Sequence, residues 1–265
     1  MLILQNANGL EPEITFNCGQ CFRWLPAPGG WQGVVSGCSV LLRQEGSSLI
    51  LEGAEEKDRL FWEHYFALDM DYPALQARFC AGSRRLKLCV EENPGIRVLR
   101  QPFFETLCTF IISQNNNIPR IKQLCDRISE RYGTKVGDTC AFPTAEQMRD
   151  ITEQDYKDMK FGFRAKYLAD AVAKVLDGAI SEEKVKSLTY EEAQKYLMQI
   201  KGVGPKVADC VLLFSCRQYR SFPKDVWIKK AMAQLFPDGI PKEIEGYEGI
   251  AQQYIFHFAR HNLKE

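Results

Sequence analysis

Lys206 and Asp225 are the residues of this sequence whose types and positions best suit covalent chemistry on a substrate. Lys206 directly follows a Gly-Val-Gly-Pro turn at 202–205, and Asp225 stands a short distance beyond the helix that this turn opens. A lysine amine is protonated, and therefore a poor nucleophile, at neutral pH. Burial and the positive end of a helix both disfavour that charged form, so the position favours an amine nucleophile. Asp225 could stabilise positive charge that develops on a sugar.

The elements that must hold these residues are two helices joined by the glycine turn. The first helix is predicted to start at Thr189, an N-cap with Glu192 at the capping-box position, and to end at Gly202. Gly202 and Gly204 permit backbone angles that other residues avoid. Pro205 suits the first turn of the second helix, whose apolar residues recur at helical spacing: Val207, Val211 and Phe214. Unpaired N–H groups at such a turn bind anions such as a DNA phosphate.

Each of these features also has a simpler interpretation. A Gly-x-Gly turn occurs in ordinary pairs of packed helices. Lys206 could be a solvated phosphate contact, and Asp225 could only cap the helix that it opens. The lysine, the turn and the carboxylate together, at this spacing, favour catalysis.

The segment from 188 to about 232 resembles the helix-hairpin-helix and Gly/Pro/Asp motif of base-excision DNA glycosylases, in particular the 8-oxoguanine DNA glycosylase/lyase family. Five further stretches resemble that family in the same order along the chain: Cys18–Trp24, Phe61–Tyr72, Ser113–Ile121, Phe161–Tyr167 and Gly249–Phe256. The resemblance therefore extends over most of the sequence.

The resemblance implies a role for each residue of the active centre. Lys206 would attack the sugar C1′, expel the damaged base and form a Schiff base that permits β-elimination, with Asp225 stabilising the oxocarbenium-like transition state. The Gly19 carbonyl would accept from N7–H of 8-oxoguanine, a hydrogen that guanine lacks. Gln252 would bind the Watson–Crick edge of the flipped base. Two residues would lie against its faces: Phe256 and Cys210.

The resemblance also implies contacts with duplex DNA, because such enzymes must extrude their target base. Asn115, Arg120 and Arg164 would contact the cytosine left behind, and Phe163 would wedge into the vacated stack. The hairpin residues would grip the backbone without reading sequence: Gly202, Val203 and Gly204. The sequence departs from the family at two of its positions. Phe163 stands where a tyrosine is frequent, and Trp227 stands where better-known members carry a histidine.

The overall charge counts mildly against a nucleic-acid partner, and its distribution along the chain softens that objection. The 265 residues include 34 basic and 34 acidic side chains, so the net charge is zero, whereas nucleic-acid-binding domains are usually basic. Between Lys201 and Lys230, however, seven basic residues face only Asp209 and Asp225. We expect salt-sensitive binding of double-stranded DNA with an oxidised guanine through this patch, by a monomer.

No metal or other cofactor is expected. The ten cysteines are scattered, only the Cys18 and Cys21 pair has metal-like spacing, and none follows Cys216. Buried free thiols in a reducing compartment fit this pattern. No apolar run is long enough to span a membrane, and the N-terminus does not resemble a secretory signal. We expect an intracellular protein in the cytoplasm or nucleoid, or in the nucleus of a eukaryote.

The elements predict an α+β fold. Residues 1 to about 53 favour a small antiparallel sheet, with strands near 33–35, 39–42 and 48–51, and helical periodicity begins near residue 55. Helices are expected over 103–112, 118–132, 145–159, 164–176 and 181–185. We predict a sheet domain with a linker helix over 1–95, helical domains over 96–265 that contain the hairpin (about 188–232), and a C-terminal helix.

Three functions remain open. The first is a bifunctional DNA glycosylase/AP lyase that excises 8-oxoguanine, opposite cytosine. The second is a monofunctional alkylpurine glycosylase that uses only an aspartate and a water, against which Lys206 and Gly19 argue. The third is a non-catalytic helix-hairpin-helix module, which would leave Gly19 and Gln252 unexplained.

Overall fold

A computed structural model of the chain describes residues 1–7 and 9–263. The short apolar runs near the N-terminus form a five-stranded antiparallel sheet of order β1-β5-β4-β3-β2. Its strands are β1 (Leu2–Leu4), β2 (Trp24–Ala27), β3 (Gly30–Val35), β4 (Cys38–Glu45) and β5 (Ser48–Glu52). The three strands that the sequence predicted are confirmed. β1, β2 and the short helix α1 (Pro12–Asn17) between them were not predicted.

The sheet has its own aromatic core. The Trp24 indole stacks on Phe16 with ring centroids 4.3 Å apart, and its Nε1–H donates to the Tyr65 hydroxyl over 2.8 Å. Tyr65 belongs to α2 (Arg59–Tyr65), which follows a short 3-10 helix, η1 (Glu56–Asp58). This core also includes Leu99, which lies well beyond the last strand.

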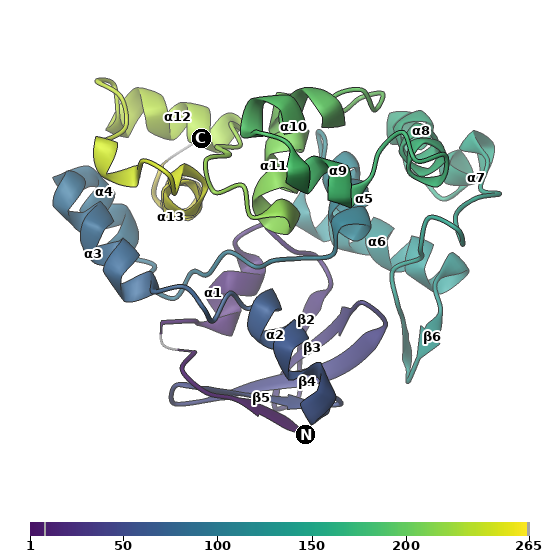
Figure 1. The fold of residues 1–265 in the computed structure, drawn as a ribbon, viewed down its shortest axis with the longest axis horizontal. Coiled ribbons are helices and arrows are strands. Elements are labelled where there is room, and N and C mark those ends of the chain that lie inside the picture. The colour runs from purple at the N-terminus through teal and green to yellow at the C-terminus, as the bar shows by residue number, and fades with distance from the viewer. Residues whose placement is uncertain (8, 264–265) are drawn as a thin grey trace.

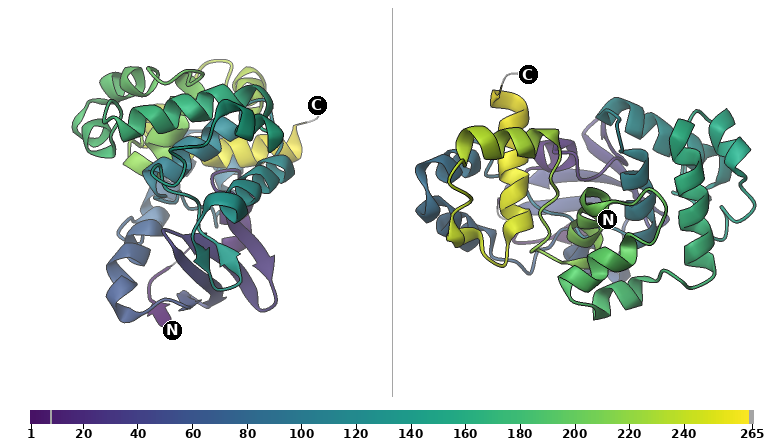
Figure 2. Two further views of the ribbon diagram at one scale, coloured as in Figure 1. Left: turned by 90° about the vertical axis from the view of Figure 1, so that its right-hand side faces the viewer. Right: turned by 90° about the horizontal axis from the view of Figure 1, so that it is seen from above.

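The rest of the chain forms a helical layer on one side of the sheet (Figures 1 and 2). Its first part comprises α3 (Tyr72–Gly82), α4 (Arg84–Glu91), α5 (Phe103–Ile112), α6 (Ile118–Tyr132), the hairpin of β6 (Lys135–Val136) and β7 (Thr139–Cys140), α7 (Glu153–Asp158), η2 (Gly162–Arg164) and α8 (Ala165–Leu176). Its second part comprises α9 (Glu182–Ser187), α10 (Tyr190–Leu197), α11 (Pro205–Cys216), α12 (Val226–Leu235), η3 (Lys242–Ile244) and α13 (Glu248–Asn262).

Helix α5 is the centre of this layer, as its apolar sequence predicts. It packs against α11, and Phe110 stacks on Phe214 with centroids 5.3 Å apart and planes 13° from parallel. Viewed from above, α3 and α4 lie at the end of the layer where α13 lies, and α7 and α8 lie at the other (Figure 2). The buried residues of α3 and α4 join the helical core, while Leu99 joins that of the sheet. The division of the chain near residue 95 therefore stays a prediction.

The helix predicted over 145–159 is wrong in its first half. Residues 145–150 form turns, and only Glu153–Asp158 is helical. The reason is a second capping box, in which Thr152 caps a new helix and the Asp155 carboxylate accepts from the Thr152 N–H over 2.9 Å. The helices expected over 103–112 and 118–132 are confirmed with the same bounds, and those near 164–176 and 181–185 differ only at their ends.

Within the described ranges, every helix is too short or too polar to cross a bilayer.

Candidate active site

The predicted helix-hairpin-helix forms from α10, a turn and α11, but the first helix ends at Leu197 and not at Gly202 as predicted. Thr189 caps α10, and its N–H donates to the Glu192 carboxylate over 3.0 Å, which confirms the capping box. Pro205 opens α11, and the first intrahelical bond runs from the Ala208 N–H to the Gly204 carbonyl at 3.0 Å. The amides before Ala208 therefore have no acceptor within the helix, and they give the hairpin an anion-binding end.

The two glycines of the turn serve different purposes. Gly202 has φ +77°, and a Cβ there would lie 2.4 Å from the Tyr167 ring. Gly204 has φ −98° and ψ −178°, an extended conformation open to any residue, and a Cβ there would meet nothing within 4 Å. The prediction that both glycines need special backbone angles is therefore wrong for Gly204. Its missing side chain instead leaves open space beside the free amides.

Asp170 on α8 fastens the turn to the rest of the helical layer. Its carboxylate accepts from the Lys201 backbone N–H over 2.8 Å and from the Lys174 ammonium over 2.7 Å. Together with the Tyr167 ring, which packs on Gly202, this contact holds the turn against α8. Neither residue was singled out from the sequence, because a carboxylate and a tyrosine on an amphipathic helix give no signal of a tertiary contact.

Lys206 lies in the first turn of α11, as predicted, and is half-buried. Its Nζ is 5.3 Å from the centre of the Phe110 ring. The charge of Lys206 reaches the Cys210 thiol one turn further along α11: burial raises the pKa of Cys210 to about 11, and Lys206 opposes that rise. The amine therefore points along the helix into the protein, toward the core of the layer.

Asp225 is the N-cap of α12, and its carboxylate accepts from the Ile228 N–H over 2.8 Å. The capping interpretation is thus confirmed. Burial raises the pKa of Asp225 above its ordinary value, although the bond from Ile228 and the charge of Lys206 both oppose this. The carboxylate therefore caps α12, and the charge of Lys206 favours its ionised form.

Both residues line one cavity of about 50 Å³. Six residues that the sequence placed in the active centre meet there: Gly19, Lys206, Cys210, Asp225, Gln252 and Phe256. Five further lining residues were not predicted: Cys18, Phe110, Phe214, Pro223 and Gln253. The two phenylalanines had no distinguishing signal, since each lies in an apolar run of its helix, where a ring that faces a cavity has the same neighbours in sequence as a ring that faces the core. Gln253 had one, because a second amide beside Gln252 is unusual on a buried helix.

The loop that carries Gly19 is held by the residue after it. Gly19 has φ +81°, which favours glycine, and a Cβ there would contact the Phe256 ring at 3.4 Å. Gln20 is fully buried, and its Nε2 donates to the carbonyls of Thr15 and Arg97 over 3.0 and 2.8 Å. The Gly19 backbone is therefore set in the wall of the cavity by fixed hydrogen bonds.

The residues expected to contact the unpaired cytosine gather in a second cluster. The Arg164 guanidinium donates to the backbone carbonyls of Gln114 and Asn115, the latter over 2.8 Å, and stacks on the Phe163 ring at 4.5 Å. Asn115 has φ +47°. Arg120 donates to the Lys160 carbonyl over 3.2 Å. None of these four predicted residues lines the lysine cavity.

Phe163 is the most exposed aromatic ring of this cluster. It is 47% exposed, so the ring is accessible to a partner. The ring lies edge-on to Tyr167, with centroids 6.0 Å apart, and Tyr167 in turn packs on Gly202, so the cluster adjoins the hairpin.

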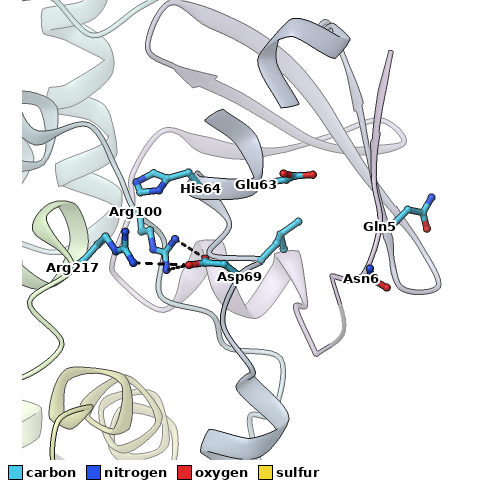
Figure 3. A pocket seen from close by; sticks show the side chains of 8 residues that line it. Gln5, Asn6, Glu63, His64, Asp69, Arg100 and Arg217 are labelled. Carbon is cyan, nitrogen blue, oxygen red and sulfur yellow. Dashed lines mark hydrogen bonds and ion pairs between the residues drawn. The ribbon is translucent and has the colours of Figure 1, made fainter. Parts of the chain in front are cut away.

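A larger polar cavity of about 400 Å³ lies away from the hairpin turn, between the sheet and the helical layer. Figure 3 shows the guanidinium groups of Arg100 and Arg217 on the same side of Asp69, and their nearest nitrogens are 2.6 and 3.9 Å from its carboxylate. Burial raises the pKa of Asp69, but its bonds with Arg100 outweigh this and hold it below the ordinary value. No lysine lines this cavity. We interpret it as part of the interface between the sheet and the helical layer.

Arg217 does not belong to the basic patch around the hairpin. It is the C-cap of α11, and Lys206 lies near the other end of this helix, 11 residues or roughly 16 Å away at about 1.5 Å per residue. The patch expected over 201–230 is therefore divided. The other six basic residues are exposed or half-buried: Lys201, Lys206, Arg220, Lys224, Lys229 and Lys230.

All ten cysteines are free thiols, and burial raises the pKa of Cys18 to about 12. Among the described residues, histidine, cysteine and carboxylate side chains form no group that could hold a metal ion.

Comparison with known proteins agrees with this arrangement. The family model for the 8-oxoguanine DNA glycosylase N-terminal domain matches residues 2–107, and that for the HhH-GPD superfamily of base excision DNA repair proteins matches residues 108–247. The N-glycosylase/DNA lyase of Saccharomyces cerevisiae is 31% identical over 80% of this chain and 64% of its own length, so the chain spans slightly less than two thirds of that relative. The N-glycosylase/DNA lyase OGG1 of Arabidopsis thaliana is 30% identical over 86% of this chain and 67% of its own length.

A solved structure extends the likeness over the whole fold. The 8-oxoguanine glycosylase/lyase of Clostridium acetobutylicum, in complex with double-stranded DNA containing cytosine opposite 8-oxoguanine, superposes with a TM-score of 0.92 at 38% identity, covering 98% of this chain and 95% of that one. The whole fold thus occurs in a protein of similar length. The chain belongs to the 8-oxoguanine DNA glycosylase family of the HhH-GPD superfamily.

Proposed function

We propose that this protein is a bifunctional DNA glycosylase/AP lyase that excises 8-oxoguanine from duplex DNA, opposite cytosine. The observation that carries the proposal is the shared cavity, in which Lys206, Asp225 and the Gly19 loop meet at the end of an anion-binding hairpin. A backbone phosphate held by the hairpin amides would bring the sugar of a flipped nucleotide over this cavity.

The chemistry follows from the positions of the two charged side chains. The neutral Lys206 amine attacks C1′, a new N–C bond forms, and the bond from C1′ to the base breaks with its electrons leaving on the base. Asp225 faces the positive charge that develops on the sugar. Opening of the sugar ring then gives an iminium, and loss of a proton from C2′ expels the 3′ phosphate. The base leaves with the bonding electrons and takes up the proton that the attacking nitrogen releases, and water accepts the proton lost from C2′.

Recognition of the lesion rests on the Gly19 carbonyl. A carbonyl oxygen is only an acceptor, and 8-oxoguanine carries a hydrogen on N7 where guanine carries a lone pair. Guanine would instead place its N7 lone pair opposite the Gly19 carbonyl, so that two acceptors face each other. Each buried acceptor without a donor would weaken binding by roughly 1–3 kcal/mol. Asn115, Arg120 and Arg164 would contact the cytosine left behind, and the exposed Phe163 ring would fill the gap in the stack.

The cavity must open before a base can enter. Its volume of about 50 Å³ is far below the ~300–1,000 Å³ of pockets that hold small molecules. Phe256 is half-buried and its ring contacts the Gly19 loop. We infer that this ring moves aside and then stacks on the base, whose other face lies against Cys210.

The partner is double-stranded DNA, bound by a monomer, in the compartment that holds the genome. The alkylpurine glycosylase remains the second candidate, because Asp225 and a water alone could release a base that is already a good leaving group. It leaves Lys206 without a role. The non-catalytic module is weaker still, since a cavity lined by an amine and a carboxylate serves no purpose in gripping a backbone.

The proposal is tested with a duplex that carries 8-oxoguanine opposite cytosine. Wild type should release the base, nick the strand and form a covalent adduct with DNA in borohydride. Lys206→Gln should do none of these, whereas Lys184→Gln, an exposed lysine on α9, should behave as wild type. Base release without an adduct would favour the second candidate, and binding without base release the third.

A further inference from the structure

Gln253 on α13 has a buried hydrogen-bond acceptor without a donor. The side chain is 3% exposed and lines the same cavity as Lys206 and Asp225. Its Nε2 donates to Oε1 of Gln252 over 2.7 Å. Its own Oε1 is buried and has no hydrogen-bond partner among the described residues. A buried acceptor without a donor destabilises a fold, so its place in a binding cavity indicates a donor on the ligand.

The direction of the hydrogen bonds at this point is set by a backbone carbonyl. Gln252 Nε2 donates to the Pro223 carbonyl over 3.0 Å, and a carbonyl can only accept. Gln252 must therefore turn its Oε1 toward Gln253, which in turn must present Nε2. Gln253 Oε1 ends this row of hydrogen bonds, and it is consequently an acceptor. Exchange of the oxygen and nitrogen in either amide would place two acceptors or two donors opposite each other.

We propose that Gln253 is a second base-reading residue, whose Oε1 accepts a hydrogen bond from the exocyclic 2-amino group of a guanine-derived base. This inference rests on the proposed function, in which Gln252 faces the Watson–Crick edge. That edge offers donors at N1 and at the 2-amino group, and an acceptor at O6.

The donors and acceptors of the two amides match this edge without breaking any bond that they already make. Gln252 Oε1 has a second lone pair, which takes N1–H, and Gln252 Nε2 has a second hydrogen, which reaches O6. Gln253 Oε1 takes the 2-amino hydrogen. Because Gln253 and Pro223 hold Gln252 from both ends, the reading amide is oriented before the base arrives.

A pocket built in this way distinguishes bases by the 2-amino group. 8-Oxohypoxanthine is 8-oxoguanine without that group, so it would leave Gln253 Oε1 as unpaired as it is in the empty cavity. We expect wild type to excise 8-oxoguanine about 10- to 100-fold faster than 8-oxohypoxanthine, the factor typical of one buried polar group without a partner.

The test compares single-turnover excision of the two bases, each opposite cytosine, by wild type and by Gln253→Met. Methionine keeps the length of the side chain but neither donates nor accepts as an amide does. In this variant the ratio of the excision rate of 8-oxoguanine to that of 8-oxohypoxanthine should fall toward one, because 8-oxoguanine is excised more slowly. Differences in pairing and leaving-group reactivity between the bases affect both enzymes equally. Gln154→Met on α7, an exposed glutamine, is the matched control and should keep the wild-type ratio.

Three outcomes overturn the proposal: an unchanged ratio in Gln253→Met, an equal loss on both substrates, and a wild-type ratio near one. The second would show that Gln253 only supports the cavity wall. Nicking of a duplex with a ready-made abasic site needs no base recognition, so it verifies that the variant is folded. If Gln253→Met does not fold, Gln253→Ala is measured in its place with the same expected ratio. Failure of wild type to excise 8-oxoguanine at all contradicts the proposed function and not this proposal.

Discussion

The two glycines of the hairpin predict opposite outcomes for the same substitution. In Gly202→Ala, the Cβ must sit at φ +77° and 2.4 Å from atoms of the Tyr167 ring. The left-handed backbone costs about 1–2 kcal/mol and the overpacking about 1–3 kcal/mol. We therefore expect Gly202→Ala to lower the free energy of unfolding by roughly 2–5 kcal/mol.

Gly204→Ala should leave the fold intact and weaken DNA binding. Its extended backbone and open surroundings accept a methyl group. Alanine is a poorer N-cap than glycine but restricts the unfolded chain, and these opposing effects should keep the change in stability within about 1 kcal/mol. The methyl group would instead occupy the space where a phosphate approaches the free amides. Loss of one or two hydrogen bonds to a charged phosphate should raise the dissociation constant about 10- to 100-fold.

Both effects are measured on the same proteins. Urea unfolding followed by tryptophan fluorescence gives the free energy of unfolding, and fluorescence anisotropy at one fixed salt concentration gives the affinity for a duplex with a stable abasic-site analogue. If Gly204→Ala binds this duplex as tightly as wild type, the hairpin amides are not the phosphate site. If Gly202→Ala is as stable as wild type, the role assigned to the Tyr167 contact is wrong.

Three other substitutions test separate parts of the structure. Asp225→Asn keeps a good N-cap, so stability and duplex affinity should hold while single-turnover excision falls about 10²–10³-fold; comparable turnover would remove the carboxylate from the mechanism. Phe163→Ala should cost under about 1 kcal/mol of stability, because the ring is 47% exposed, yet slow excision of a paired lesion more than cleavage at an abasic site. Burial raises the pKa of Glu105 from 4.5 to about 7. Between these two pH values the folded state keeps the carboxyl proton and the unfolded state has released it, so wild type loses stability as the pH rises through this range. The free energy of unfolding of Glu105→Gln, measured with urea relative to that of wild type, should therefore be roughly 2–3 kcal/mol more favourable at pH 8 than at pH 5. The same difference between the two proteins at both pH values would refute the assignment.

The elements that hold Lys206 and Asp225 could be predicted from the sequence because they depend on local rules. The capping box at Thr189, the proline that opens α11 and the N-cap at Asp225 each follow from a few neighbouring residues. The turn glycines are visible for the same reason, although only Gly202 needs its special backbone angle. Local rules place the ends of helices, and the ends of helices carry Lys206 and Asp225.

What the sequence did not predict depends on contacts between distant segments. Tyr167 and Asp170 support the hairpin from α8, and Phe110 and Phe214 line the cavity from two apolar helices. Nothing in an apolar run distinguishes a ring that faces a cavity from one that faces the core. Gln253 is the intermediate case, since its type was visible but the missing donor emerges only from the hydrogen bonds of the folded chain.

The proposed mechanism depends on one amine, placed at the first turn of α11 in the small cavity, that bonds to the sugar of the damaged nucleotide. Peptide mapping by mass spectrometry of the borohydride-reduced adduct with 8-oxoguanine duplex tests it most directly. We expect the sugar remnant on Lys206 and no adduct with Lys206→Gln. A remnant on another lysine or on the N-terminal amine of wild type would contradict it.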